Sequence, residues 1–179
     1  ADLIGPNILN IMTHLFYKRL KDKRKVSWHQ DASYWPSTPT KTITVWLALD
    51  DVSAQNGAMK FIPGSHHHGQ IPLRASDVGE HNVLNQTVSS PEDWGENAVN
   101  VELKAGQISI HSDLLLHGSE PNLSTTDRRG LTLRYMPSDV QCTDSNFGKN
   151  RLAFQCLGTN PEKHWSIAVS YTHLRAHET

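Results

Sequence analysis

The chain has 179 residues, which is the length of one ordinary domain with a sizeable core. Its 17 basic and 18 acidic residues leave a formal net charge of −1, which excludes the basic field that gathers nucleic acid or an anionic membrane. Hydrophobic residues make up 37% of the chain, too many for a disordered protein, yet no apolar run approaches the ~18 residues of a membrane span. We therefore expect a soluble globular protein.

Short segments of strand length dominate the chain, and they are rich in Val, Ile, Leu, Thr and aromatic residues. Turn signals such as Asn56-Gly57 and Pro63-Gly64 separate them, and only residues 138–157 leave a helical pattern open. Many short strands with frequent turns favour a β-sandwich or barrel, and a jelly roll fits. The predicted strands are residues 8–17, 41–49, 58–62, 99–103, 107–111 and 131–136.

The remaining segments predict how the domain is bounded. Residues 74–97 are polar, and we expect a loop excursion over one face. Residues 170–179 have no periodicity and resemble a translated adapter peptide, so they are predicted to be a non-native or disordered tail after a single domain of residues 1–169. Two cysteines are too few for a disulfide framework and lack CxxC spacing, which favours a reducing, cytoplasmic location.

Histidine is unusually frequent, with 11 in the chain, and imidazole is a common metal ligand. In Trp28-His29-Gln30-Asp31 the imidazole and the carboxylate are two residues apart. On an extended strand both would point the same way, and Gln30 would point to the opposite side. They would supply two of the three ligands in the 2-His-1-carboxylate set, which leaves open positions on Fe(II). Taken alone, such a pair is a weak signal, because it is common at turns and surfaces.

A second histidine must come from a distant segment, and residues 106–119 offer two. His111 closes an apolar strand and is explained as a buried core residue or as one that lies behind the ligands. His117 precedes Gly118, where a bend in the backbone can aim a side chain into the mouth of a barrel, so we favour His117. The tract His66-His67-His68 is predicted to be a surface turn, because consecutive side chains diverge.

Arg128 lies eleven residues after His117, at the start of the next predicted strand. A guanidinium offers a rigid fork of donors that matches a carboxylate, so an arginine near a metal could hold the far end of a dicarboxylate. For one of two adjacent arginines, however, a solvated surface charge is the simpler interpretation. The residue types alone do not single out Arg128 over Arg129.

Six separated blocks follow one another in a fixed order between Gly5 and Met136. They read Trp28-His29-Gln30-Asp31, Tyr34-Trp35-Pro36, Thr44-Val45-Trp46-Leu47-Ala48-Leu49-Asp50, Asn56-Gly57-Ala58-Met59, Pro63-Gly64-Ser65-His66, and His117-Gly118-Ser119 with Asn122 and Arg128. Together they resemble the phytanoyl-CoA dioxygenase family. The resemblance implies a double-stranded β-helix of the jelly-roll, cupin-like type, with minor helices. Members usually carry more chain before the Gly5-Pro6-Asn7 block, so the N-terminal part of the family domain is expected to be missing.

The resemblance also implies roles for particular residues. His29, Asp31 and His117 would be the ligands of Fe(II), and 2-oxoglutarate and O2 would be the cosubstrates. Arg128 would pair with the distal carboxylate of 2-oxoglutarate, and Ser119 would assist it. An aromatic residue lines the cosubstrate pocket in this family, which makes Trp46 a candidate, although a core position explains it more simply.

The leading hypothesis is a 2-oxoglutarate-dependent dioxygenase that hydroxylates an unactivated C–H bond of a small organic substrate and releases succinate and CO2. Relatives that halogenate carry a small residue in place of the carboxylate, so Asp31 favours hydroxylation. One alternative is a cupin-like metal-binding protein without redox turnover, which would have no use for a carboxylate clamp. The other is a zinc-dependent hydrolase with a metal-bound water, although no HExxH motif is present. The sequence leaves the substrate and the oligomeric state open.

Overall fold

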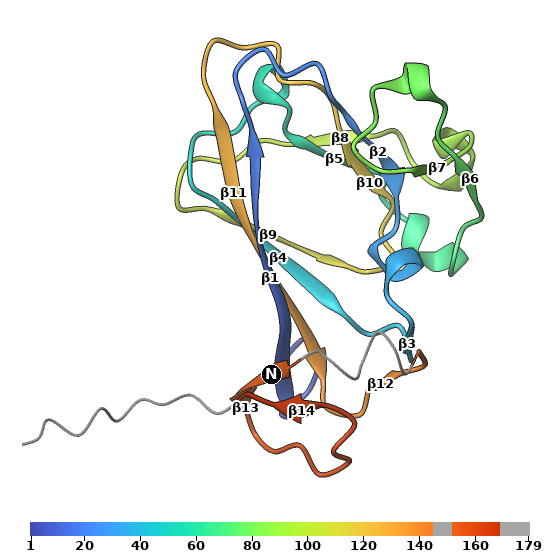
Figure 1. The fold of residues 1–179 in the computed structure, drawn as a ribbon, viewed down its shortest axis with the longest axis vertical. Coiled ribbons are helices and arrows are strands. Elements are labelled where there is room, and N and C mark those ends of the chain that lie inside the picture. The colour runs from blue at the N-terminus through green and yellow to red at the C-terminus, as the bar shows by residue number, and fades with distance from the viewer. Residues whose placement is uncertain (145–151, 169–179) are drawn as a thin grey trace, which may run out of the picture.

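Two main β-sheets build the molecule, and the larger has six strands in the order β14-β13-β1-β11-β4-β9 (Figure 1). The computed structural model describes residues 1–144 and 152–168. Neighbouring strands run antiparallel, except that β13 and β14 are parallel. The strands are β1 (Ile8–Lys18), β4 (Ile43–Ala48), β9 (Ile108–Ser112), β11 (Arg128–Pro137), β13 (Leu152–Leu157) and β14 (Ser166–Ile167).

The smaller sheet has four strands in the order β2-β10-β5-β8 and lies beside β1 and β11 in Figure 1. These strands are β2 (Val26–His29), β5 (Met59–Phe61), β8 (Val99–Val101) and β10 (His117–Ser119). The helices are single 3₁₀ turns: η1 (Asp31–Tyr34), η2 (Ala54–Asn56), η3 (Ser65–His68), η4 (Val78–Glu80) and η5 (Pro91–Trp94). The predicted mainly β, jelly-roll fold with minor helices is therefore confirmed. In the described part of the chain, no helix is long and apolar enough to cross a membrane.

Two segments differ from the sequence-based expectation. Residues 74–97, predicted as a loop, carry η4, η5 and most of a hairpin of β6 (Leu73–Ala75) and β7 (Gln86–Val88), whose Val88 is buried. For residues 138–157 the sequence allowed a helix, but the described residues of this stretch form two strands, β12 (Gln141–Cys142) and β13. Strand β12 pairs with β3 (Ser37–Thr38). Strands of two or three residues are too short for a periodic signal. Residues 145–151 and the predicted tail at 170–179 lie outside the described residues.

Strand alternation puts polar side chains on the inner face of the six-stranded sheet. On β4 the buried positions are Thr44, Trp46 and Ala48, and on β11 they include Arg128 and Arg134. The register aligns these side chains in rows across the strands. One row holds Met12, Arg134, Thr44 and His111, and the row at the end of β1 holds Lys18 and Arg128.

Gly130 on β11 lets the Trp46 side chain lie across the inner face. A Cβ at Gly130 would sit 1.9 Å from the indole ring, so any other residue would displace it. The buried apolar residues otherwise form separate clusters, such as the one that includes Leu9, Met136 and Trp165. Between these clusters, the inner face of the six-stranded sheet lines a cavity.

Candidate active site

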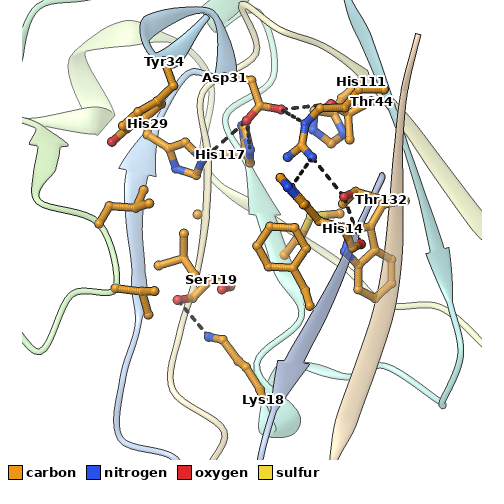
Figure 2. Close-up of a pocket in the computed structure, with 18 of the residues that line it drawn as sticks. His14, Lys18, His29, Asp31, Tyr34, Thr44, His111, His117, Ser119 and Thr132 are labelled. Atoms are coloured by element: carbon orange, nitrogen blue, oxygen red, sulfur yellow. Dashed lines mark hydrogen bonds and ion pairs between the residues drawn. The ribbon is translucent and has the colours of Figure 1, made fainter. Parts of the chain in front are cut away.

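A cavity of about 390 Å³ opens between the two sheets and is lined by side chains of both. This volume lies within the range of small-molecule sites. Figure 2 shows His29, Asp31 and His117 gathered at one end of the cavity, with Lys18 and Ser119 at the other. The two ends therefore differ in chemistry, since two imidazoles and a carboxylate meet at one end and a lysine and a hydroxyl lie at the other.

His29, Asp31 and His117 meet although 88 positions of sequence separate the two histidines, because their strands pair. His117 on β10 lies directly opposite His29 on β2, and their ring centroids are 4.2 Å apart. Oδ1 of Asp31 is 3.9 Å from Nε2 of His29 and 4.0 Å from Nε2 of His117. All three side chains are buried, and one potential ligand atom from each lies within 4.8 Å of the others. Two metal–ligand bonds of about 2.1 Å span at most about 4.2 Å, so the two distances from Oδ1 of Asp31 are short enough for a shared ion.

Backbone carbonyls orient both imidazoles. Nδ1 of His29 donates to the carbonyl of Ser27 at 2.8 Å, and Nδ1 of His117 donates to that of Leu115 at 2.8 Å. Because Nδ1 carries the hydrogen, the lone pair of Nε2 is free to bind a cation. Burial, together with the neighbouring His117, lowers the pKa of His29 to about 3. The ring is therefore neutral at physiological pH, as a metal ligand must be.

The carboxylate of Asp31 is oriented from its other oxygen. The Thr44 hydroxyl donates to Oδ2 at 2.9 Å, and Nε of Arg134 lies 3.8 Å from the same atom. These contacts leave Oδ1 facing the two imidazoles. Burial opposes the negative charge, but His117 and the positive charge of Arg134 outweigh it and lower the pKa of Asp31.

The predicted single strand through His29 and Asp31 is wrong, although the predicted directions are right. Strand β2 ends at His29, and η1 begins at Asp31. Gln30 between them keeps an extended backbone, with φ −112° and ψ 135°, so the side chains still alternate. Gln30 points away from the site, and its amide donates to the carbonyls of Gly69 and Leu114. The strand ends here because the next residues turn, with the amide of Ser33 bonded to the carbonyl of Gln30.

His111 lies next to the three-residue group without joining it. It sits on β9, on the inner face, and its ring centroid is 4.7 Å from that of His117. Among the described residues, the group able to hold an ion contains His117 and not His111. Neither ring nitrogen of His111 has a hydrogen-bond partner within residues 1–144 and 152–168. The His66-His67-His68 tract lies on η3, with all three side chains exposed, as expected for a surface turn.

Arg128 is buried at the far end of the cavity. Its guanidinium lies over the Trp46 ring at 5.3 Å and donates to the carbonyl of Gly57 at 2.5 Å, while its Nε has no partner in the part of the chain that the structure describes. Ser119 on β10 is also buried and lines the same cavity. Arg129 points to the opposite face, where it pairs with Asp50 at 2.6 Å. The structure thus separates the two adjacent arginines that residue type alone could not distinguish.

Two buried cations on the cavity wall were not predicted. Lys18 is buried at the end of β1, and Nζ donates to the carbonyls of Ser119 and Glu120. Arg134 lies six residues after Arg128 on β11 and therefore on the same face. This even spacing was the available signal for Arg134. For Lys18, the only available signal was its position at the end of the first predicted strand.

The donor set fits the chemistry of a redox-active divalent metal. Two imidazoles and one carboxylate are the donor set of non-haem Fe(II) sites that keep positions open for other ligands. Tyr34 and Trp35 line the cavity on the η1 side, and the Tyr34 ring lies 5.9 Å from that of His29. The same cavity therefore offers a metal-binding group, aromatic walls and buried cations.

Comparison with known proteins gives consistent relatives. Residues 2–130 match the family model described as Phytanoyl-CoA dioxygenase (PhyH). The chain is 35% identical over 117 residues to a probable alpha-ketoglutarate-dependent hypophosphite dioxygenase of Stutzerimonas stutzeri, a match covering 64% of this chain and 41% of that protein. It is 30% identical over 146 residues to the human peroxisomal phytanoyl-CoA dioxygenase, covering 78% and 43%.

Solved structures agree in fold. The apo form of the non-heme monooxygenase ThoJ superposes with a TM-score of 0.73 at 30% identity, covering 94% of this chain and 58% of that one. The alpha-ketoglutarate-dependent epimerase SnoN has a TM-score of 0.63 at 20% identity, covering 93% and 62%, and shares the fold. The chain spans about two fifths of the length of the curated relatives it matches. On the match across residues 2–130, the chain belongs to the phytanoyl-CoA dioxygenase family.

Proposed function

We propose that the chain carries the active site of an Fe(II)- and 2-oxoglutarate-dependent oxygenase that acts on a small molecule. The observation that carries this proposal is the buried group of His29, Asp31 and His117, which faces one cavity together with Arg128. Family membership supports it, as do relatives whose names specify alpha-ketoglutarate dependence. We assign the three residues as the iron ligands.

Bound iron, with 2-oxoglutarate and O2, would supply the oxidising chemistry that converts the keto acid into succinate and CO2. The residues of the chain bind and orient the cosubstrate. Arg128 binds the distal carboxylate through its guanidinium, and Ser119 assists from the neighbouring strand. Trp46 holds the guanidinium from one side and forms part of the cavity wall.

The finer proposal is hydroxylation of an unactivated C–H bond. Its support is the carboxylate of Asp31, since relatives that halogenate have a small residue at this position. A metal-binding protein without turnover would not need a buried guanidinium at the remote end of its cavity. A zinc hydrolase would need a general base, and the carboxylates among the described cavity residues are Asp31 and Asp22, the latter paired with Arg24. The oxygenase therefore accounts for more of the site.

Anaerobic titration with Fe(II) and 2-oxoglutarate tests the proposal. A chelated keto acid gives a visible charge-transfer band, which we expect for the unaltered chain. The band and the bound iron should be lost in His29→Ala, Asp31→Ala and His117→Ala. The exposed His66→Ala is the matched control and should bind like the parent. Retention of iron in all three ligand variants would refute the assignment. Loss of iron in His111→Ala but not in His117→Ala would show that His111, and not His117, is the ligand.

A further inference from the structure

Two buried cations stand side by side at the end of the cavity remote from His29, Asp31 and His117. Lys18 and Arg128 are cross-strand partners on β1 and β11, and their residues are 7% and 3% exposed. Both line the cavity. Within the described residues, neither forms an ion pair with a carboxylate: Lys18 bonds the carbonyls of Ser119 and Glu120, and Arg128 bonds that of Gly57.

The neighbouring cations on the outside of the fold are treated differently. Arg129, next to Arg128 in sequence, pairs with Asp50, and Lys60 pairs with the Glu120 side chain at 3.2 Å. These two outer cations thus have carboxylate partners, although such a pair is worth little, whereas the described residues provide none for Lys18 and Arg128, where an unpaired buried charge is costly. Two adjacent like charges increase that cost. A site of this kind is complete only when an anion enters it.

The turn that includes η2 holds both cations. Gly57 accepts the bond from Arg128, and a Cβ at Gly57 would lie 3.1 Å from Cδ and 3.3 Å from Nζ of Lys18. The absent side chain therefore makes room for the lysine. Nζ has three hydrogens, and two bond to carbonyls, so one remains for a ligand. Burial, and next the Arg128 charge, lower the pKa of Lys18 to about 7. Both disfavour the charged lysine, and a bound anion would stabilise it.

We propose that Lys18 is a second cosubstrate-binding cation, and that with Arg128 it selects a keto acid carrying a second carboxylate. This inference rests on the proposed function, since it names the charge that the remote end of the cavity accepts. The competing explanation is a structural link between β1 and β10, in which Lys18 only bonds two carbonyls. A structural link predicts a loss of stability with no selectivity between ligands.

Calorimetric binding to the Ni(II)-loaded protein separates the two explanations without turnover. The probes are 2-oxoglutarate and 2-oxopentanoate, which has the same chain length but no distal carboxylate. In Lys18→Met we expect 2-oxoglutarate to bind about 10- to 100-fold more weakly, the effect of losing a charged hydrogen bond. Binding of 2-oxopentanoate should change less than about threefold, because it never makes that contact. Lys60→Met is the matched control and should bind both probes like the parent.

Two further variants guard against a folding defect. Lys18→Gln keeps a donor for the carbonyls but removes the charge, so it should fold and still lose the selectivity. Lys18→Arg restores the charge and should recover most of the 2-oxoglutarate affinity. Equal weakening of both probes in Lys18→Gln, or no weakening of either, would overturn the role of Lys18 while leaving the proposed function intact. Failure of the parent protein to bind either keto acid would instead overturn the proposed function and this inference with it.

Discussion

The two faces of the six-stranded sheet reverse the usual distribution of polar and apolar residues. The inner face buries Lys18, Thr44, Arg128 and Arg134. The outer face exposes large apolar side chains, which include Leu15 at 62%, Ile108 at 50% and Ile110 at 45%. The inner face therefore lines a cavity and does not form a single packed core.

The outer apolar residues are continuous across the sheet. Leu15 on β1 pairs with Leu131, Leu131 with Leu47, and Leu47 with Ile108, so one row crosses four strands. Inner-face substitutions should therefore change mainly the affinity for ligands. Outer-face substitutions should change neither that affinity nor the arrangement of the cavity residues.

The adjacent arginines give the sharpest test, because they lie on opposite faces. Removal of the inner guanidinium in Arg128→Ala should weaken 2-oxoglutarate by about 2–5 kcal/mol, the cost of truncating one partner of a buried charge pair. Iron binding should be nearly intact, and pyruvate, which lacks the distal carboxylate, should lose little. Binding titrations of both keto acids measure this. The outer-face Arg129→Ala should leave both affinities unchanged, and a larger effect from it would contradict the division.

The buried imidazoles should make the metal-free protein sensitive to acid. Burial, and next the neighbouring His117, lower the pKa of both His29 and His111 to about 3, against about 6.5 in an unfolded chain. Between these values the unfolded chain binds more protons, so the free energy of unfolding falls as pH falls, by up to about 1.4 kcal/mol per pH unit for each histidine. Thermal unfolding at pH 7, 6 and 5 measures it. His111→Phe should remove about half of this dependence, and an unchanged dependence would show that His111 is charged in the folded state.

Thr44 tests whether the inner face orients the carboxylate of Asp31. Thr44→Val keeps the shape but removes the 2.9 Å hydrogen bond to Oδ2, so Oδ1 should be held less firmly toward the imidazoles. We expect metal affinity to fall about 10-fold or more, as for other residues that orient a ligand. Competition with a chelator measures the affinity. The control is Thr13→Val on β1, which is not part of the cavity wall and should bind metal normally.

The smallest effect should come from the outer face. Ile108→Thr exchanges one β-branched residue for another at a half-exposed position, and we expect the free energy of unfolding to change by less than about 0.5 kcal/mol. Iron and 2-oxoglutarate binding should be unchanged. Denaturant titration and binding titration check the two parts. A loss of cosubstrate affinity here would show that the two faces are coupled.

Much of the fold could be predicted, because alternation and turn residues report on local structure. All six predicted strands exist. The largest shift of a strand end is three residues, at the start of Arg128–Pro137. The inward side chains of His29 and Asp31 also followed from alternation. That His117 lies opposite His29 depends on strand pairing, which no local pattern encodes. The choice of His117 rests on the bend expected at Gly118 and on the family resemblance.

The missed residues share one physical reason. A lysine or arginine in a strand is usually solvated, so the sequence favours the outer face for Lys18 and Arg134. The structure buries both because the cavity, and not apolar packing, lies behind them. The hairpin of β6 and β7 was missed for a different reason, since three-residue strands are stabilised by pairing and not by their own pattern.

The pairing of His29 with His117 has a consequence for assembly of the small sheet. Strands β2 and β10 have only four and three residues, and their register shifts between His117 and Ser119. A slip of one residue would turn the His29 side chain to the opposite face of the sheet. An ion bound by both imidazoles would therefore favour the native strand alignment, and its binding would report that these two short strands had paired in the correct register.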